Sequence, residues 1–155
     1  MPRIGGGSPR KTQAALAEVD KPSPAAQTAA MIMTLFHVAL GGALGASARY
    51  LTNVAVIRAF GQGFPYGTLL VNVLGSFLMG VLVAVLAHKG GMRFAPFLMT
   101  GLLGGFTTFS AFSLDAFTLW ERGEAGLAAL YVGGSVFLSI AALIAGVLTM
   151  RGVLA

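Results

Sequence analysis

The fold is decided by the stretch Gly104-Gly105-Phe106-Thr107-Thr108-Phe109-Ser110-Ala111-Phe112-Ser113, which lies inside an apolar run at residues 95–119. Paired glycines are where a helix most readily breaks, and a break frees backbone carbonyl groups that lipid cannot satisfy. Irregular, hydroxyl-rich backbone is tolerated at membrane depth only where protein or a polar cavity surrounds it. The stretch therefore predicts a transmembrane helix that is broken mid-membrane and that forms a site for an ion or a small solute.

The composition around this stretch is that of a membrane protein. Of the 155 residues, 56% are hydrophobic and only 10% are charged, and the mean hydropathy is +0.83. A soluble domain carries about 25% charged residues. Four apolar runs, at residues 35–57, 66–87, 95–119 and 126–150, each reach the roughly 20 residues that a helix needs to cross the hydrocarbon. We predict an all-α membrane protein with four transmembrane helices, which leaves no room for a soluble catalytic domain and argues against an enzyme.

Residues 1–30 differ in composition from the rest of the chain. They hold four of the six prolines, three consecutive glycines and scattered basic side chains, without apolar periodicity. This composition is typical of disorder. We therefore predict a disordered N-terminal tail at residues 1–30 and a four-helix transmembrane channel domain at residues 31–155. A start codon assigned upstream of the true one, at Met31 or Met33, would explain the tail equally well.

Other features exclude further classes of protein and of site. The net charge of +5 comes without interleaved basic and aromatic residues, so nucleic acid is not an expected partner. The absence of cysteine excludes disulfides and thiolate metal sites. Ala46-Ser47-Ala48 imitates a signal-peptidase site, but the apolar run continues to Ile57 and the basic residues lie far upstream of it. The first run is therefore expected to span the lipid bilayer and not to be cleaved.

The basic residues in the loops are almost balanced across the membrane. With four spans, one side carries Lys89, Arg93 and Arg151, and the other carries Arg58 and Arg122. Three against two is almost no positive-inside bias. Two interpretations stay open: a weakly oriented protein whose tail decides the topology, or a protein that inserts both ways and pairs head to tail.

Polar and small residues within the runs fall into stripes with a spacing of four. The three stripes are Thr68, Asn72 and Ser76; Tyr131, Ser135 and Ser139; and Gly41, Gly45 and Arg49. Each stripe lies on one helix face and is about 12 Å long. Packing is the alternative explanation, because Ser and Thr often bond their own i−4 carbonyl and small residues let helices approach closely. The Asn72 amide is harder to explain in this way, because its own helix alone cannot satisfy it.

Acidic residues are almost absent from the runs. Only Asp115 occurs, toward the end of the third run. Cation transporters and proton relays place carboxylates at membrane depth. Here the inventory consists of donors: hydroxyl groups, the Asn72 amide, Arg49 and the positively polarised ring edges of Phe106, Phe109 and Phe112. These groups favour a small anion over a cation.

Three motifs of the chain are similar to those of a known family. From about Met33 to its end it resembles the CrcB/Fluc fluoride channels. The matching motifs are Gly41-Gly42-Ala43-Leu44-Gly45-Ala46-Ser47-Ala48-Arg49-Tyr50, Gly67-Thr68-Leu69-Leu70-Val71-Asn72-Val73-Leu74-Gly75-Ser76-Phe77 and the stretch from Gly104 to Ser113. The order of the three motifs, their spacing and their placement on the expected helices all agree with the family's pattern.

The resemblance implies an antiparallel, dual-topology homodimer in the cell inner membrane, with two antiparallel pores that let cytoplasmic fluoride leave passively. It implies a structural Na⁺ at the dimer centre, held by backbone carbonyls of Gly104 and Thr107 from each subunit. The implied fluoride-pore residues are Thr68, Asn72, Phe109, Ser110, Phe112, Tyr131, Ser135 and Ser139, and the implied vestibule residue is Arg49. Ala111 departs from the family, whose members often carry threonine there, so one hydroxyl of the ion path is lost.

Counting carbonyls agrees with a monovalent cation. Two breaks meeting on a two-fold axis, with two carbonyls each, give four neutral oxygen ligands. Divalent Ca²⁺ or Mg²⁺ normally calls for carboxylates or retained waters. The alternative is that the hydroxyl groups of Thr107 and Thr108 satisfy the freed carbonyls, which would leave no metal site.

Two other functional classes fit part of the pattern. Small multidrug transporters share the length, the four helices and the antiparallel pairing, but they need a carboxylate in the first helix, and residues 35–57 contain none. A membrane scaffold that dimerises through small residues would leave Asn72 and the hydroxyl stripes unexplained.

Overall fold

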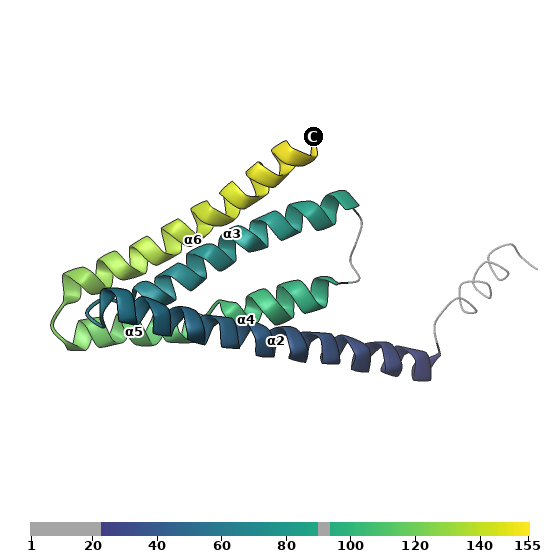
Figure 1. The fold of residues 1–155 in the computed structure, drawn as a ribbon, viewed down its shortest axis with the longest axis horizontal. Coiled ribbons are helices and arrows are strands. Elements are labelled where there is room, and N and C mark those ends of the chain that lie inside the picture. The colour runs from purple at the N-terminus through teal and green to yellow at the C-terminus, as the bar shows by residue number, and fades with distance from the viewer. Residues whose placement is uncertain (1–22, 90–93) are drawn as a thin grey trace, which may run out of the picture. The chain divides into compact units, whose positions relative to one another are not determined.

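The computed structural model describes residues 23–89 and 94–155, although nothing is described of the Lys89 side chain. The described residues are helical throughout apart from short connections (Figure 1). The elements are α2 (Pro24–Phe60), α3 (Tyr66–Lys89), the π-helix η1 (Pro96–Leu103), α4 (Gly104–Phe106), α5 (Phe109–Glu121) and α6 (Ala125–Leu154). Four spans are long and apolar enough to cross a membrane: Pro24–Phe60, Tyr66–His88, Pro96–Glu121 and Ala125–Leu154. The prediction of an all-α chain with four such helices is confirmed.

The first helix begins earlier than the sequence suggested. Ser23 caps it by accepting a hydrogen bond from the Ala26 amide at 3.2 Å, and Pro24 occupies the first helical position, where its missing N–H costs nothing. The alanine-rich segment that follows has high helix propensity. Residues 24–30 are therefore helical, in contrast to the tail predicted for residues 1–30. The rest of that predicted tail, residues 1–22, lies outside the described residues.

Residues up to Met33 and residues from Thr34 onward form two separate units, and the second contains the bundle. Within the bundle, α3 and α6 lie side by side (Figure 1). Two glycines make this approach reciprocal: a Cβ on Gly80 would meet the Leu143 carbonyl oxygen, and one on Gly146 would meet the Phe77 carbonyl oxygen. Small residues let backbones approach in this way where lipid supplies no hydrophobic drive for association.

The second half of α2 packs on the third span in the same manner. Gly41 and Gly45 are buried, and a Cβ on Gly45 would meet the Leu102 carbonyl oxygen. From the other side, a Cβ on Gly105 would come within 2.7 Å of the Gly42 carbonyl oxygen. The glycine spacing in the first apolar run therefore serves close helix packing.

The third span is interrupted, but at Thr107 and Thr108 and not at the paired glycines. Gly104 and Gly105 lie in α4, so the chain is helical through the paired glycines. The extended residues are Thr107 (φ −82°, ψ 160°) and Thr108 (φ −155°, ψ 123°), which separate α4 from α5. The physical reason is that Gly105 is needed against α2, whereas the two threonines can hold an extended backbone with their own side chains and with a partner on α3.

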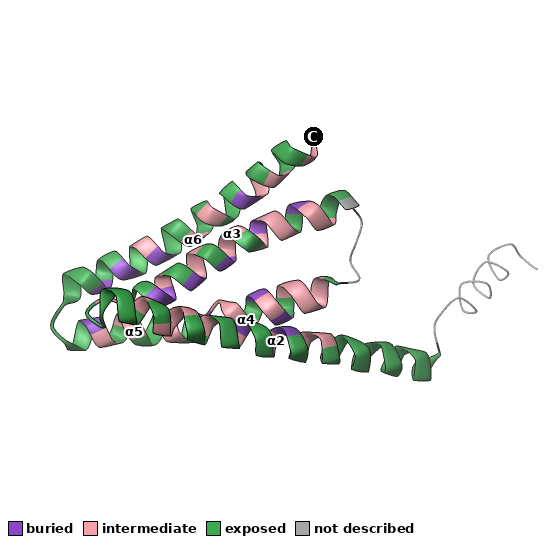
Figure 2. Ribbon diagram, viewed as in Figure 1, coloured by how far each residue is buried: buried purple, intermediate pink, exposed green. Residues whose placement is uncertain are grey.

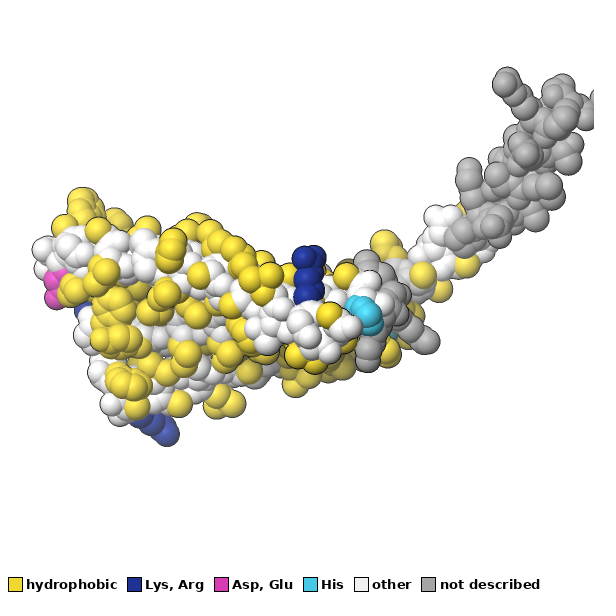
Figure 3. All heavy atoms as spheres, turned by 90° about the horizontal axis from the view of Figure 1, so that it is seen from above, with side chains coloured by type: hydrophobic (Ala, Val, Ile, Leu, Met, Phe, Trp, Pro, Cys, Tyr) yellow, Lys and Arg dark blue, Asp and Glu magenta, His cyan; other side chains and the backbone are white. Residues whose placement is uncertain are grey.

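The surface of the bundle is apolar. Buried residues lie where helices face one another, and the outward faces are exposed (Figure 2). Hydrophobic side chains are spread over the whole described part of the face in Figure 3, and the acidic side chains visible there lie at one end. Leu51, Phe109, Leu130 and Phe137 are among the large hydrophobic residues that are exposed. An apolar surface of this extent fits lipid or a second protein surface and not water.

Candidate functional site

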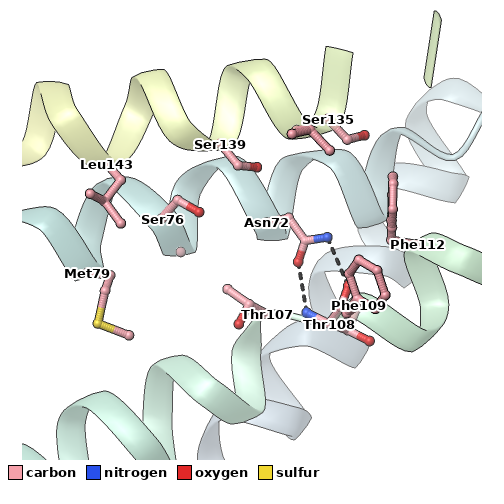
Figure 4. Close-up of a pocket in the computed structure, with 12 residues that line it drawn as sticks. Asn72, Ser76, Met79, Thr107, Thr108, Phe109, Phe112, Ser135, Ser139 and Leu143 are labelled. Carbon is pink, nitrogen blue, oxygen red and sulfur yellow. Dashed lines mark hydrogen bonds between the residues drawn. The ribbon is translucent and has the colours of Figure 1, made fainter. Parts of the chain in front are cut away.

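Most of the predicted pore residues meet in one groove. It has a volume of about 300 Å³ and lies between α3, the third span and α6 (Figure 4). The residues that line it are Asn72, Gly75, Ser76, Met79, Thr107, Thr108, Phe109, Phe112, Ser135, Val136, Ser139 and Leu143. None of these described residues carries a charge, so the groove offers hydroxyl groups, one amide, aromatic rings and alkyl groups.

Asn72 ties α3 to the extended segment of the third span. Its Nδ2 donates a hydrogen bond to the Thr108 carbonyl at 2.9 Å, and its Oδ1 accepts one from the Thr108 amide at 2.8 Å (Figure 4). The Asn72 oxygen thus replaces the carbonyl acceptor that the Thr108 amide would have had in a regular helix. Because an amide NH₂ group has two donors, one N–H remains for a solute in the groove. The expected role of Asn72 as a donor is therefore joined by a second role, which is to hold the backbone at this point.

Thr108 is also the N-cap residue that precedes α5. Its Oγ1 accepts a hydrogen bond from the Ala111 amide at 3.2 Å and lies 3.3 Å from the Ser110 hydroxyl. This is an N-cap, which satisfies one of the free amides at a helix start. The neighbouring Thr107 turns back instead, and its hydroxyl donates to the Leu103 carbonyl at 2.9 Å.

Because of these contacts, two backbone carbonyl groups lack the hydrogen bond from an amide that they would accept in a regular helix. In a continuous helix the Thr108 amide would bond the Gly104 carbonyl, and the Ala111 amide would bond the Thr107 carbonyl. Here the first amide goes to Asn72 Oδ1 and the second to Thr108 Oγ1. The Gly104 and Thr107 carbonyls are the pair that the resemblance assigns to Na⁺. Their neutral oxygen atoms are suitable ligands for a hard cation. Among the described residues there is no cluster of histidine or acidic side chains that could hold a metal.

The two predicted pore phenylalanines have different surroundings. Phe112 is 8% exposed, whereas Phe109 is 78% exposed. Their ring centroids lie 5.5 Å apart, and the Phe112 ring lies 5.4 Å from that of Tyr131. Phe112 therefore forms part of the packed wall of the groove, and Phe109 presents its ring to whatever lies beside the subunit.

Ser135 has an unusual environment for a buried hydroxyl group. It is 4% exposed, lines the groove, and its Oγ has no hydrogen-bond partner among the described residues. An unpartnered buried hydroxyl costs about 1–3 kcal/mol. A solute or a water molecule in the groove would remove that cost. Ser139, one turn further along α6, lines the same groove (Figure 4).

A second hollow of about 340 Å³, which we call the loop-side hollow, lies beside the connection between α2 and α3. Its lining includes Phe64, Thr68, Ala111 and Asp115. Thr68, a predicted pore residue, is buried here and not in the groove. Ala111, the position that departs from the family, also faces this hollow.

The remaining predicted residues line neither hollow. Tyr131 is buried beside both, Ser110 is exposed next to Thr108, Gly104 is exposed, and Arg49 is half-buried on α2. Two residues of the groove, Thr108 and Ser76, were named in the sequence analysis but not among the predicted pore residues. Thr108 could have been found from its position as a capping residue before α5, and Ser76 from its place in the same stripe as Asn72.

Comparisons with known proteins all indicate one family. The model of the family described as "CrcB-like protein, Camphor Resistance (CrcB)" matches residues 36–147. A protein of Cereibacter sphaeroides named "Fluoride-specific ion channel FluC" is 74% identical over 122 residues, which cover 79% of this chain and 98% of the relative. A protein of the same name from Ruegeria sp. is 62% identical over 125 residues, which cover 80% of this chain and 99% of the relative. Another from Paracoccus denitrificans is 60% identical over 122 residues, which cover 79% of this chain and 98% of the relative.

Proposed function

The chain belongs to the CrcB family, and from this membership we propose that it is a fluoride-selective ion channel that lets cytoplasmic fluoride leave the cell passively. The relatives of high identity are named as ion channels, a class of protein that is not enzymatic. The four apolar spans support a multi-pass membrane protein. Because the proposed function is export of cytoplasmic fluoride, the proposal includes the cell inner membrane as its location.

The observation that carries the proposal is the lining of the groove. It contains hydroxyl groups, an amide and aromatic rings, and none of its described residues is acidic. A buried cation needs a countercharge, whereas an anion needs donors. The lining therefore favours an anion, and the buried Ser135 hydroxyl, which meets no hydrogen-bond geometry in the described structure, supports a donor on the wall of the groove.

The chemistry of fluoride agrees with this lining. Fluoride is small and strongly hydrated, so a pore has to replace its water with closely spaced donors. The hydroxyl groups of Ser76, Ser135 and Ser139 and the second N–H of Asn72 are available along the groove. Several sites of moderate strength let an ion leave as well as enter. Chloride is larger and accepts hydrogen bonds less strongly, so a narrow groove of this kind rejects it.

A dual-topology homodimer with two antiparallel pores completes the proposal. The balanced basic residues in the loops support insertion in both orientations. The exposed Phe109 ring supports a second subunit, because an aromatic side chain that lines a groove on one edge gains by packing on a partner on the other. The helix interruption at Thr107 and Thr108 would then lie at mid-membrane, where the two subunits meet.

A structural Na⁺ at that meeting point is part of the same proposal. The Gly104 and Thr107 carbonyls lose the amides that a regular helix would supply, and this supports them as ligands. Two such carbonyls from each of two subunits give four neutral oxygens. The ion would stabilise the dimer by neutralising carbonyl dipoles in a low-dielectric interior, without being transported.

The experiment that tests the function is ion efflux from liposomes that contain the purified protein. With potassium fluoride inside and valinomycin to carry potassium, we expect rapid fluoride efflux without a proton gradient or ATP. With potassium chloride under the same gradient, we expect efflux at the level of empty liposomes. Comparable efflux of the two anions would overturn the proposal.

A further inference from the structure

Asp115 is an unexpected residue beside a path for an anion. Within the four described spans it is the only acidic residue besides Glu121, which ends α5. A carboxylate inside a membrane span is costly, and its partner usually reveals its role. A negative charge near an anion pathway also raises the energy of the ion. The residue therefore needs a reason to be there.

Its partner is Tyr131. The Tyr131 hydroxyl group donates a hydrogen bond to Asp115 Oδ2 at 3.2 Å. Tyr131 lies on α6 and is 1% exposed, so the bond is made by a side chain with little freedom to move. A phenol has a single O–H donor. While this bond is kept, Tyr131 cannot donate a hydrogen bond to fluoride.

The Tyr131 ring is held by aromatic neighbours on two sides. Its centroid lies 5.4 Å from that of Phe112 and 5.6 Å from that of Phe64, which meets it edge-on at 90°. Phe112 lines the groove, whereas Phe64 and Asp115 line the loop-side hollow. Tyr131 thus contacts residues that line both hollows and forms the partition between them. Asp115 and Phe112 are three residues apart on α5, so one face of that helix holds both the ring and the hydroxyl of Tyr131.

We infer that Asp115 is a positioning residue for selectivity: it holds the Tyr131 hydroxyl, and through the Tyr131 ring it holds Phe112 at the partition between the groove and the loop-side hollow. This inference rests on the proposed channel function. A hydrogen bond is directional, so the bond from Tyr131 to Asp115 restrains the ring more than packing alone does. A partition that cannot widen passes the smaller anion and excludes chloride.

The test compares variants of the purified full chain in liposomes. Asp115→Asn keeps an acceptor oxygen in place of Oδ2, Asp115→Ala removes it, and Tyr131→Phe removes the donor. Glu121→Ala is the matched control, because it removes an exposed acidic side chain from the same helix. Fluoride and chloride efflux are measured for each variant and for the double variant Asp115→Ala/Tyr131→Phe.

We expect Asp115→Asn and Glu121→Ala to keep the ratio of fluoride to chloride efflux within about threefold of the unaltered protein, because both leave an acceptor for Tyr131. Asp115→Ala and Tyr131→Phe should each lower that ratio by about tenfold, and the double variant should be no worse than the worse single variant. If Asp115→Asn loses as much selectivity as Asp115→Ala, the charge and not the hydrogen bond matters, and the inference is wrong. Losses that multiply in the double variant would also overturn it.

A second measurement does not depend on transport. The melting temperatures of the same variants in detergent form a double-mutant cycle, and coupled residues give losses that do not add. Additive losses would reject the contact even if the channel function holds. If instead the unaltered protein passes no fluoride while the cycle shows coupling, the proposed function fails and the contact between the two residues stands.

Discussion

The α3–α6 pair and the third span both bring backbone close to backbone, but they do so in opposite ways. In the pair, Gly80 and Gly146 let two regular helices touch, and each helix keeps its own hydrogen bonds. In the third span, the helix begins as a π-helix, becomes an α-helix, and gives way to two extended residues that a side chain from α3 holds in place. Regular helices supply the frame, and the one interrupted span supplies the polar groups that face the groove.

The difference shows what each glycine and each polar residue contributes. Gly80 and Gly146 are needed because a side chain would collide with a carbonyl oxygen on the partner helix. Asn72 is needed because an extended segment in a membrane has backbone groups that lipid cannot satisfy. Changes in the α3–α6 contact should therefore cause misfolding, and changes in the interrupted span should reduce transport by a protein that still folds.

The largest effect should come from a substitution in the contact between α3 and α6. Gly146→Leu places a side chain against the Phe77 carbonyl oxygen, and both helix backbones would have to move. We expect loss of folded protein, because forcing atoms into a packed contact costs roughly 1–3 kcal/mol or more. Size-exclusion chromatography of the detergent extract measures this. The control is Gly133→Leu on the same helix, where an added Cβ meets nothing within 4 Å; a monodisperse Gly146→Leu protein would show that the frame is more tolerant than its geometry indicates.

The next effect should appear in the interrupted span. Asn72→Asp keeps the acceptor for the Thr108 amide but loses the donor to the Thr108 carbonyl, and it turns a carboxylate toward an anion path. We expect fluoride efflux to fall by about a hundredfold or more, since both the backbone contact and the electrostatics change. The control, Ser47→Ala, removes a hydroxyl that bonds only within its own helix. Normal efflux from Asn72→Asp would remove this residue from the pore.

A smaller effect is expected from the aromatic wall. Phe112→Ile keeps an apolar side chain but removes the ring that packs on Phe109 and Tyr131. An aromatic pair contributes about 0.5–1.5 kcal/mol beyond its buried area, so we expect fluoride efflux to fall by about tenfold with the dimer intact. Phe137→Ile is the comparison, because that ring is 75% exposed on α6. Equal efflux from both variants would mean that ring edges do not contribute to the path.

The smallest effect is expected at the N-terminus. A protein that begins at Met33 should conduct fluoride at the unaltered rate, because the groove is built entirely from residues beyond that point. Liposome efflux of the shortened protein measures this. A shortened protein that assembles as a dimer but does not conduct would assign the N-terminal segment a part in transport.

The sequence located three of the four spans to within about four residues and missed the early start of α2 at Pro24, because apolar runs of this length have a single common explanation whereas an alanine-rich extension does not. It placed the helix interruption only approximately. Paired glycines are ambiguous, since they serve either a break or a close approach, and at Gly105 the approach to α2 decides. The actual interruption depends on Asn72, which is 36 residues away along the chain from Thr108, and no local pattern reveals such a contact.

The candidate site was predictable in part for the same reason. A spacing of four placed Asn72, Ser135 and Ser139 on faces that do meet in the groove. It could not show that Thr68 faces the loop-side hollow, because the packing of α3 against α5 and α6 separates residues of one stripe. Nor could it show that Tyr131 gives its only O–H group to Asp115, a residue on another helix.

The most direct test of the central claim, that the groove replaces the water around fluoride with protein donors, is fluoride efflux through Ser135 variants. Ser135 Oγ is buried on the wall of the groove and meets no hydrogen-bond geometry in the described structure, so we expect it to donate to an ion there. Ser135→Ala should lower fluoride efflux by about tenfold, the value of one hydrogen bond to a charged group, while Ser135→Thr should retain most of it. Efflux from Ser135→Ala equal to that of the unaltered protein would contradict the account.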